Sequence, residues 1–127
     1  MSESNSCPED LGIQIEEINK KMIEAAGTGD HEGVSRALEE GAEITCRDRR
    51  GDTGLHIGAW KGHDIVVKTL LENGIDVNLL DEGDTKWTAL MNAANYGKIS
   101  CLKILLDNDA DPDIKGEEDG QTALMYA

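Results

Sequence analysis

Apolar residues recur at helical spacing in short segments that end at glycine. Leu55 and Ala59 lie four residues apart, so they share one face of a short helix. A second helix is predicted over Asp64–Asn73, because its apolar residues return at intervals of three and four, and Gly74 follows where a left-handed cap belongs. Thr53 precedes the first helix, and its hydroxyl can accept a backbone N–H at the helix start. This part of the chain therefore predicts two helices joined by a turn.

The same helix pair occurs several times along the chain. Residues 22–29 align with residues 55–62 at an offset of 33, and these align with residues 90–97 at an offset of 35. Such a repeat indicates units that bury their apolar faces against one another, which predicts an all-α solenoid of helix-turn-helix units with short hairpin-like loops. The expected units are 18–50, 51–83, 84–116 and a partial unit at 117–127. The predicted core anchors are Leu70, Leu71, Leu105 and Leu106.

The middle unit carries the most specific motif of the chain. Residues 51–63 read GDTGLHIGAWKGH, and residues 67–78 read VKTLLENGIDVN. These segments resemble the ankyrin-repeat family, whose pattern is G-x-T-P-L-H-x-A-A-x-x-G-H followed by V-x-x-L-L-x-x-G-A-D-x-N. The resemblance covers about residues 18–127 and implies an ankyrin-repeat solenoid that binds proteins and has no catalytic site. The departures are Gly54, Ala89 and Ala123 for the family proline, Lys86 for the Gly before the third unit's Thr, and Asp109 for a C-cap Gly.

The two ends of the chain carry different expectations. Residues 1–10 are predicted to be a disordered acidic tail before an ankyrin domain over 11–127. Pro8 nevertheless suits a first helical position, so the first helix is expected to extend backward as a cap. Ala127 falls partway along the first helix of a fourth unit, so we expect an N-terminal piece of a longer protein. The alternative is a short natural chain, either a monomer or weakly self-associating through that uncapped helix.

Composition narrows the choice of partners. Asp and Glu number 26 against 12 Lys and Arg, a net charge of −14. This charge argues against binding nucleic acid or anionic lipid, whose phosphates need a basic surface. No apolar run is long enough to span a membrane, and the first ten residues do not resemble a secretory signal. Cys7, Cys46 and Cys101 are odd in number and widely spaced, which favours reduced thiols in the cytoplasm or nucleus.

Candidate catalytic and metal-binding residues have structural explanations. The family resemblance implies that His56 hydrogen-bonds backbone between repeats and that His63 lies at a turn, whereas His31 matches no pattern. Carboxylates within Asp107–Glu118 fall at positions 1, 3, 5, 7 and 12 of a calcium loop. However, Pro112 replaces the Gly that such a loop needs, and the repeat register accounts for most of these acids. No enzyme activity, metal or cofactor is therefore expected.

Asn78 is a candidate modification site. Leu70 followed by Asp76-Val77-Asn78 resembles the leucine-x5-Asp-x-Asn context that an asparaginyl hydroxylase modifies in ankyrin repeats. The alternative is that the Asn78 side chain stabilises its own turn.

The aromatic residues indicate a recognition surface. Trp60, Trp87, Tyr96 and Tyr126 all lie away from the Leu and Ala positions that fill the repeat core. The resemblance places the first three on the concave surface, and Trp and Tyr concentrate binding energy at interfaces. For Trp87 the alternative is that it packs the enlarged loop before the third unit. The predicted partner-binding residues are Arg49, Arg50, Asp52, Trp60, Lys61, Asp84, Trp87, Asn95 and Tyr96.

Three functions compete at this point. The first is a scaffold or adaptor that binds a partner protein or peptide through its concave helix and finger surface. The second is a non-catalytic arm of a larger enzyme of the kinase or ubiquitin-pathway type. The third is an acidic inhibitor of a basic groove, which the charge favours but the position of the acids, clustered at the two ends, does not.

Overall fold

The computed structural model describes residues 8–83 and 86–112 as α-helices joined by loops. The helices are α1 (Pro8–Thr28), α2 (His31–Glu39), α3 (Gly54–Lys61), α4 (Asp64–Glu72), α5 (Ala89–Asn95) and α6 (Ile99–Asp107). In these two ranges there is no β-strand, and an isolated antiparallel bridge joins Arg47 to Thr53. The predicted all-α fold of stacked helix pairs is confirmed. The partial unit at 117–127 lies outside the described residues.

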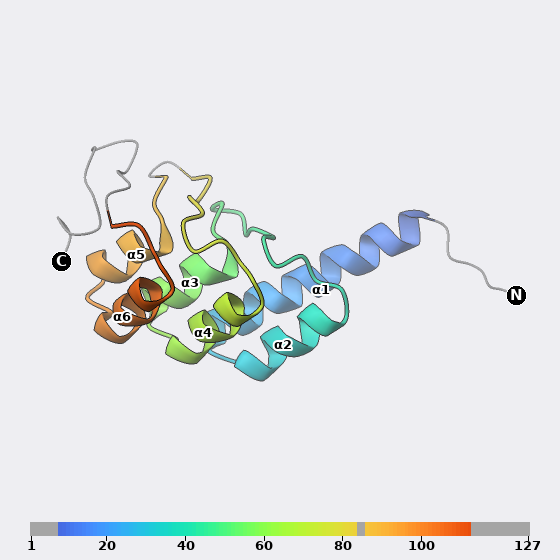
Figure 1. Cartoon of the computed structure of the whole chain (residues 1–127). Helices are drawn as coiled ribbons and strands as arrows, with labels where there is room; N and C mark the ends of the chain where they lie inside the picture. Colours follow the sequence, from blue (N-terminus) through green and yellow to red (C-terminus); the bar gives the residue numbers. More distant parts are fainter. Residues whose placement is uncertain (1–7, 84–85, 113–127) are drawn as a thin grey trace, which may run out of the picture.

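The helix pairs stack in two rows (Figure 1). Helices α1, α3 and α5 lie next to one another in one row, and α2, α4 and α6 form the other. Within each pair a tight turn reverses the chain, whereas longer loops between pairs project from one side of the stack. We call residues 40–53 the first finger and residues 73–88 the second finger. The fingers and the row of α1, α3 and α5 are therefore the elements that can build a concave surface.

Threonine hydroxyls begin the inner helices α3 and α5. Thr53 Oγ1 accepts the His56 N–H at 3.4 Å, and Thr88 Oγ1 accepts the Met91 N–H at 3.2 Å. Each bond satisfies a backbone donor that has no partner inside the helix. The helix start predicted at Thr53 is confirmed, although proline is absent from the next position.

Left-handed backbone follows the outer helices α4 and α6. Gly74 has a φ of 90°, which confirms the predicted position of a left-handed glycine after α4. Asp109 has a φ of 69° at the matching place after α6. A non-glycine residue thus adopts the conformation that glycine takes most easily, so the repeat geometry overrides local preference here.

Helix α1 is longer than the other first helices. It begins at Pro8, so residues 8–10 are helical and do not belong to a disordered tail. The predicted backward extension of this helix is observed. Met22 and Ala26 are fully buried, whereas Ile15 is exposed and the first half extends beyond the stack in Figure 1.

The core consists of small and branched aliphatic side chains. Leu70 and Leu105 are fully buried, as predicted, and Leu71 is half-buried against the core. The expectation for Leu106 is wrong, because its side chain is 41% exposed. Consecutive helical residues point about 100° apart, so a helix that buries Leu105 turns Leu106 toward solvent.

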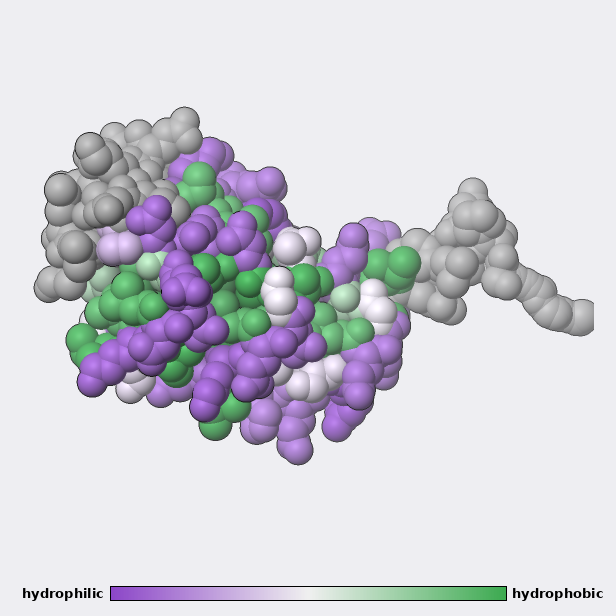
Figure 2. Space-filling view, in the orientation of Figure 1, coloured by the Kyte–Doolittle hydropathy of each residue, from purple (hydrophilic) through white to green (hydrophobic). Residues whose placement is uncertain are grey.

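Hydrophilic and apolar side chains are interspersed on the face that Figure 2 draws. Ile65 and Ile99 lie near the starts of α4 and α6 and are 56% and 58% exposed. Among the helices described, none is long and apolar enough to cross a membrane.

The neighbours Leu105 and Leu106 offer a matched test of the packing. Leu105→Ala is expected to lower the free energy of unfolding by about 2–5 kcal/mol, because it opens a cavity in the core. Leu106→Ala should cost less than about 1 kcal/mol, since its side chain already contacts solvent. Urea unfolding of both variants measures the difference, and equal losses would contradict the observed helix orientation.

Candidate partner-binding groove

A buried histidine ties α3 to the second finger. His56 Nε2 lies 2.9 Å from the Leu79 carbonyl oxygen and 3.0 Å from the Trp87 carbonyl oxygen. Because carbonyl oxygens only accept, Nε2 carries the proton, and Nδ1 accepts the Thr53 N–H at 3.3 Å. Burial lowers the pKa of His56, which keeps the ring neutral at neutral pH. The inter-repeat backbone bonds predicted for His56 are confirmed.

Asp81 closes the base of the second finger. Its Oδ1 accepts the Gly83 N–H at 2.8 Å, and its Oδ2 accepts the Trp87 N–H at 2.9 Å. The Asp81 N–H in turn donates to the Trp87 carbonyl oxygen at 2.8 Å. These bonds fix the Trp87 backbone, and its half-buried ring also packs against the core. Trp87 therefore stabilises the enlarged loop and, as described below, lines the groove as well.

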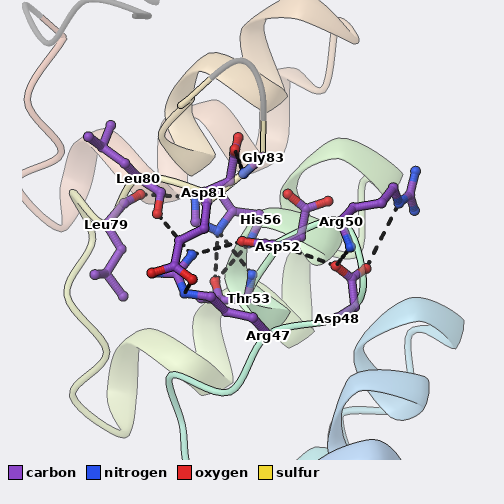
Figure 3. A network of polar contacts seen from close by, with 12 residues as sticks. Arg47, Asp48, Arg50, Asp52, Thr53, His56, Leu79, Leu80, Asp81 and Gly83 are labelled. Carbon is purple, nitrogen blue, oxygen red and sulfur yellow. Dashed lines mark hydrogen bonds and ion pairs between the residues drawn. The ribbon is translucent and has the colours of Figure 1, made fainter.

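The two fingers are bonded to each other at Gly51, within the network drawn in Figure 3. The Gly51 carbonyl oxygen accepts the Glu82 N–H at 3.0 Å and Arg47 Nη1 at 2.8 Å. Arg47 Nη1 also donates to the Leu80 carbonyl oxygen at 3.0 Å. Gly51 has a φ of 86°, and a Cβ there would lie 2.7 Å from the Glu82 carbonyl carbon. Glycine thus permits the close approach that joins the fingers.

The fingers and the ends of α3 and α5 form a groove of about 480 Å³. Trp60 at the end of α3 and Tyr96 just after α5 have ring centroids 5.5 Å apart and planes tilted by 40°. The Arg50 guanidinium carbon and the Lys61 ammonium nitrogen each lie 5.3 Å from the Trp60 ring centroid, within cation–π distance. The groove is lined by Arg49, Arg50, Asp52, Trp60, Asp81, Gly83, Trp87, Asn92 and Tyr96.

Most of the residues predicted to bind a partner come together in this groove. Lys61 lies beside it, because its Nζ contacts Trp60 and donates to the Gly27 carbonyl oxygen at 3.2 Å. Asn95 is exposed at the end of α5 and does not line the groove. Asp84 lies outside the described residues. The remaining six predicted residues, Arg49, Arg50, Asp52, Trp60, Trp87 and Tyr96, all line it.

Sequence reasoning missed part of the concave surface. Asn92 lines the groove although it is only 7% exposed, and no sequence signal separated it from the neighbouring Asn95. A second cavity of about 800 Å³ lies between α1 and the first finger and shares Arg49 with the groove. It contains no aromatic residue, so the search for aromatic positions did not find it. Its lining is Glu16, Asn19, Lys20, Ile23, Glu24, Glu43, Cys46, Arg47, Asp48 and Arg49.

Asp52 is half-buried in the groove beside two other carboxylates. Burial raises the pKa of Asp52 to about 6, and the negative charges of Asp48 and Asp81 act in the same direction. The positive charges of Arg50 and Arg47 oppose this shift without cancelling it. The groove therefore holds a carboxylate whose charge is incompletely compensated within the protein.

Asn78 connects two successive loops. Its N–H donates to Asp76 Oδ1 at 3.0 Å, and its own Oδ1 accepts the Asp111 N–H at 2.8 Å. Asp76 thus closes the turn, whereas the Asn78 amide bonds the next unit rather than its own turn. Hydroxylation of Asn78 stays a prediction.

The thiols and the acidic loop show no reactive arrangement within the described residues. Cys46 and Cys101 are free, and burial raises their pKa values to about 11 and about 12, which favours the unreactive thiol form. No group of three or more His, Cys, Asp or Glu in the described ranges is placed to hold a metal ion. Part of the calcium-loop pattern, Asp113 and Glu118, lies outside those ranges.

Comparison with known proteins agrees with this architecture. A family model for ankyrin repeats (three copies) matches residues 9–81 and 78–127, so the chain belongs to the ankyrin-repeat family. It is 33% identical over 110 residues to an ankyrin repeat-containing protein of Treponema pallidum, covering 87% of this chain and 36% of that protein. It is 32% identical over 131 residues to protein phosphatase 1 regulatory subunit 12A of Rattus norvegicus, covering 91% and 12%.

A third relative is the E3 ubiquitin-protein ligase Ufd4 of Drosophila melanogaster, 33% identical over 121 residues. The match covers 94% of this chain and 4% of the ligase. The chain thus spans only about a third or less of the length of these relatives. Ankyrin repeats are generally non-catalytic protein-interaction modules.

The contribution of the His56 hydrogen bonds to stability can be tested by replacing His56 with the residue that occupies the equivalent position of the third unit. His56→Met copies Met91 and leaves the Leu79 carbonyl oxygen and the Thr53 N–H without their His56 partner, whereas the Trp87 carbonyl oxygen keeps the Asp81 N–H. Buried polar groups without partners cost about 1–3 kcal/mol each, so we expect a loss of about 2–4 kcal/mol in unfolding free energy. Chemical denaturation followed by tryptophan fluorescence measures it. Met91→Leu, a volume-conserving control, should cost less than about 1.5 kcal/mol, and a similar loss in both variants would refute the tie.

Asp52 is expected to reduce stability at neutral pH. Its folded-state pKa of about 6 exceeds the ordinary value of 3.8, so the native state binds the proton more tightly than the unfolded chain. Stability is therefore lost as pH rises through this interval. Asp52→Asn should stabilise the protein at about pH 7.5 by up to about 1 kcal/mol, after allowance for solvent screening, and the gain should shrink toward about pH 4. Urea denaturation at the two pH values checks this, with exposed Glu17→Gln in the middle of α1 as the control that should gain much less.

Proposed function

We propose that this chain is a protein-interaction module, a scaffold or adaptor that binds a segment of a partner protein in the groove between the fingers and the inner helices. The observation that carries the proposal is the contact between Trp60 and Tyr96, with centroids 5.5 Å apart. Tyr96 keeps 52% of its surface exposed, so the pair offers apolar area to a partner. Aromatic side chains held on rigid elements lose little freedom on binding.

The shape and chemistry of the groove support a protein ligand over a reaction. Its described lining contains no Ser, Thr, Cys or His, so it offers no nucleophile paired with a histidine base. Arginines at the rim and aromatic rings toward the centre follow the usual arrangement of protein interfaces. The adjoining cavity beside α1 extends the concave surface and suits an extended segment that crosses several repeats.

The same module can serve as a non-catalytic arm of a longer protein. A phosphatase regulatory subunit and a ubiquitin ligase are among the relatives, and the matched region is 12% and 4% of their lengths. This arrangement keeps the proposed binding role and adds a further activity elsewhere. The acidic-inhibitor alternative is less favoured, because Arg49 and Arg50 line the groove together with Asp52 and Asp81, so the groove is not the continuous acidic surface that would cover a basic groove.

Two double variants test whether the partner docks in the groove or on the outer helices. Trp60→Ala with Tyr96→Ala should weaken partner binding at least about tenfold, because each truncation of an interface anchor costs about 2 kcal/mol. The control is Ile65→Ala with Ile99→Ala, which removes exposed apolar side chains from the outer helices and should leave binding unchanged.

The partner is first identified by cross-linking to the wild-type chain and then titrated calorimetrically against each variant. Melting temperatures are compared in parallel, and both pairs should stay close to the wild type. Loss of binding in the outer-helix pair alone would place the docking surface elsewhere. Unfolding of the aromatic pair would show that these rings belong to the core.

A further inference from the structure

The deep polar groups of the groove are hydrogen-bond acceptors. Asn92 is 7% exposed and lines the groove. Its Nδ2 donates to the Thr88 carbonyl oxygen at 3.3 Å, whereas its Oδ1 accepts no hydrogen bond from the described residues. The Asp52 carboxylate also makes no hydrogen bond or ion pair in this part of the chain; only the Asp52 backbone is bonded, to Asp48. The buried Asn92 oxygen and the half-buried Asp52 carboxylate can therefore both accept hydrogen bonds from a ligand that enters the groove.

The aromatic walls favour a donor that is positively charged. Trp60, Trp87 and Tyr96 line the same groove, and aromatic ring faces attract cations. The protein's own Arg50 already lies over Trp60, at 5.3 Å from the ring centroid. The Arg50 side chain is 68% exposed, and its Nε is 4.0 Å from Asp48 Oδ2, so its placement is loose. A cation from outside can therefore displace it without breaking a strong bond.

We propose that the groove accepts a lysine or arginine side chain of the partner, with Asp52 as its counter-charge, the Asn92 carbonyl as a further acceptor and the aromatic rings as its walls. This inference rests on the proposed function and names the chemistry of the partner. The chain's net charge of −14 adds long-range attraction toward a basic segment. The rim arginines then face the backbone carbonyls or acidic neighbours of that segment.

An anionic ligand fits the same groove less well. It would reach Arg49 and Arg50 at the rim, but it would bring a negative charge toward Asp52 and Asp81. It would also leave the Asn92 oxygen without a donor. The two kinds of ligand make opposite demands on Arg50, which repels a cation and attracts an anion.

The protonation state of Asp52 also distinguishes a cationic ligand from an anionic one. The charged groups that act on Asp52 are Asp48, Asp81, Arg50 and Arg47, and its pKa is about 6. Lowering the pH from about 7.5 to about 5 neutralises Asp52 and should weaken binding of a cation. An anion would bind more tightly over the same interval.

The test uses four small probes that each carry a short unbranched alkyl chain of three or four carbons: n-butylammonium, n-butylguanidinium, butyrate and 1-butanol. Each is titrated into the full-length 15N-labelled chain, and chemical shifts of the Trp60 and Trp87 indole N–H groups and the Asn92 amide are followed. The two cations should give saturable shifts at these groups, and butyrate and butanol should not. Asp52→Asn should weaken n-butylammonium binding by about fivefold or more, and Arg50→Gln should strengthen it. Asp107→Asn, an equal charge change on α6, should leave it within about twofold of the wild type, as a screened surface charge.

Each other result overturns the inference. If butyrate bound saturably and Arg50→Gln abolished this binding, the groove would be a site for an anion. Equal responses to all four probes would mean that only the alkyl chain is recognised, and no saturable shift with either cation would mean that no cation site exists. Because no partner is present in these titrations, a negative result here leaves the aromatic docking surface to be judged separately by the Trp60 and Tyr96 variants.

Discussion

The buried imidazole of His56 is the interaction on which the geometry of the groove depends. It is bonded on one side to Thr53 at the start of α3 and on the other to two carbonyl oxygens of the second finger. A neutral ring provides one donor and one acceptor, which matches these partners and imposes no charge on the interior. The third unit has Met91 at this position and the first has Ile23, and neither side chain can donate. Among the described units this interaction is therefore specific to the middle repeat, beside the groove that Trp60 and Trp87 line.

The second finger is fixed from several directions, so the groove is largely formed before any ligand binds. Asp81 holds the backbone of Trp87, and Arg47 with Gly51 joins this finger to the first one. Such bonds remove freedom from the loop during folding and not at the moment of binding. The remaining adaptable element is the exposed Arg50 side chain, which lies over Trp60. A rigid groove with one displaceable cation at its rim is suited to selecting a partner by charge as well as by shape.

Much of the fold could be predicted from the sequence, because the pattern of one helix pair recurs several times along the chain. Thr53, Gly74 and the interval of 33 to 35 residues each indicate the boundaries that the structure shows. The sequence indicated less clearly which of two adjacent residues on a helix faces the core. Leu105 and Leu106 are chemically equal, and only the packing of α6 against α4 and α5 decides which one is buried.

The candidate site could be predicted to a similar extent, and its prediction was incomplete for a related reason. Aromatic residues outside the core positions identified Trp60 and Tyr96, because residue type alone carries that signal. Asn92 and Asn95 have the same side chain three residues apart, and which of them faces the groove depends on where the second finger lies. The position of that finger is determined by the bond of His56 to the Trp87 carbonyl oxygen, across 31 residues of sequence, and by the bond of Asp81 to the Trp87 N–H within the finger. The fold and the proposed recognition surface thus depend on the same two buried polar residues, whereas Trp60 and Tyr96 stand outside the aliphatic core.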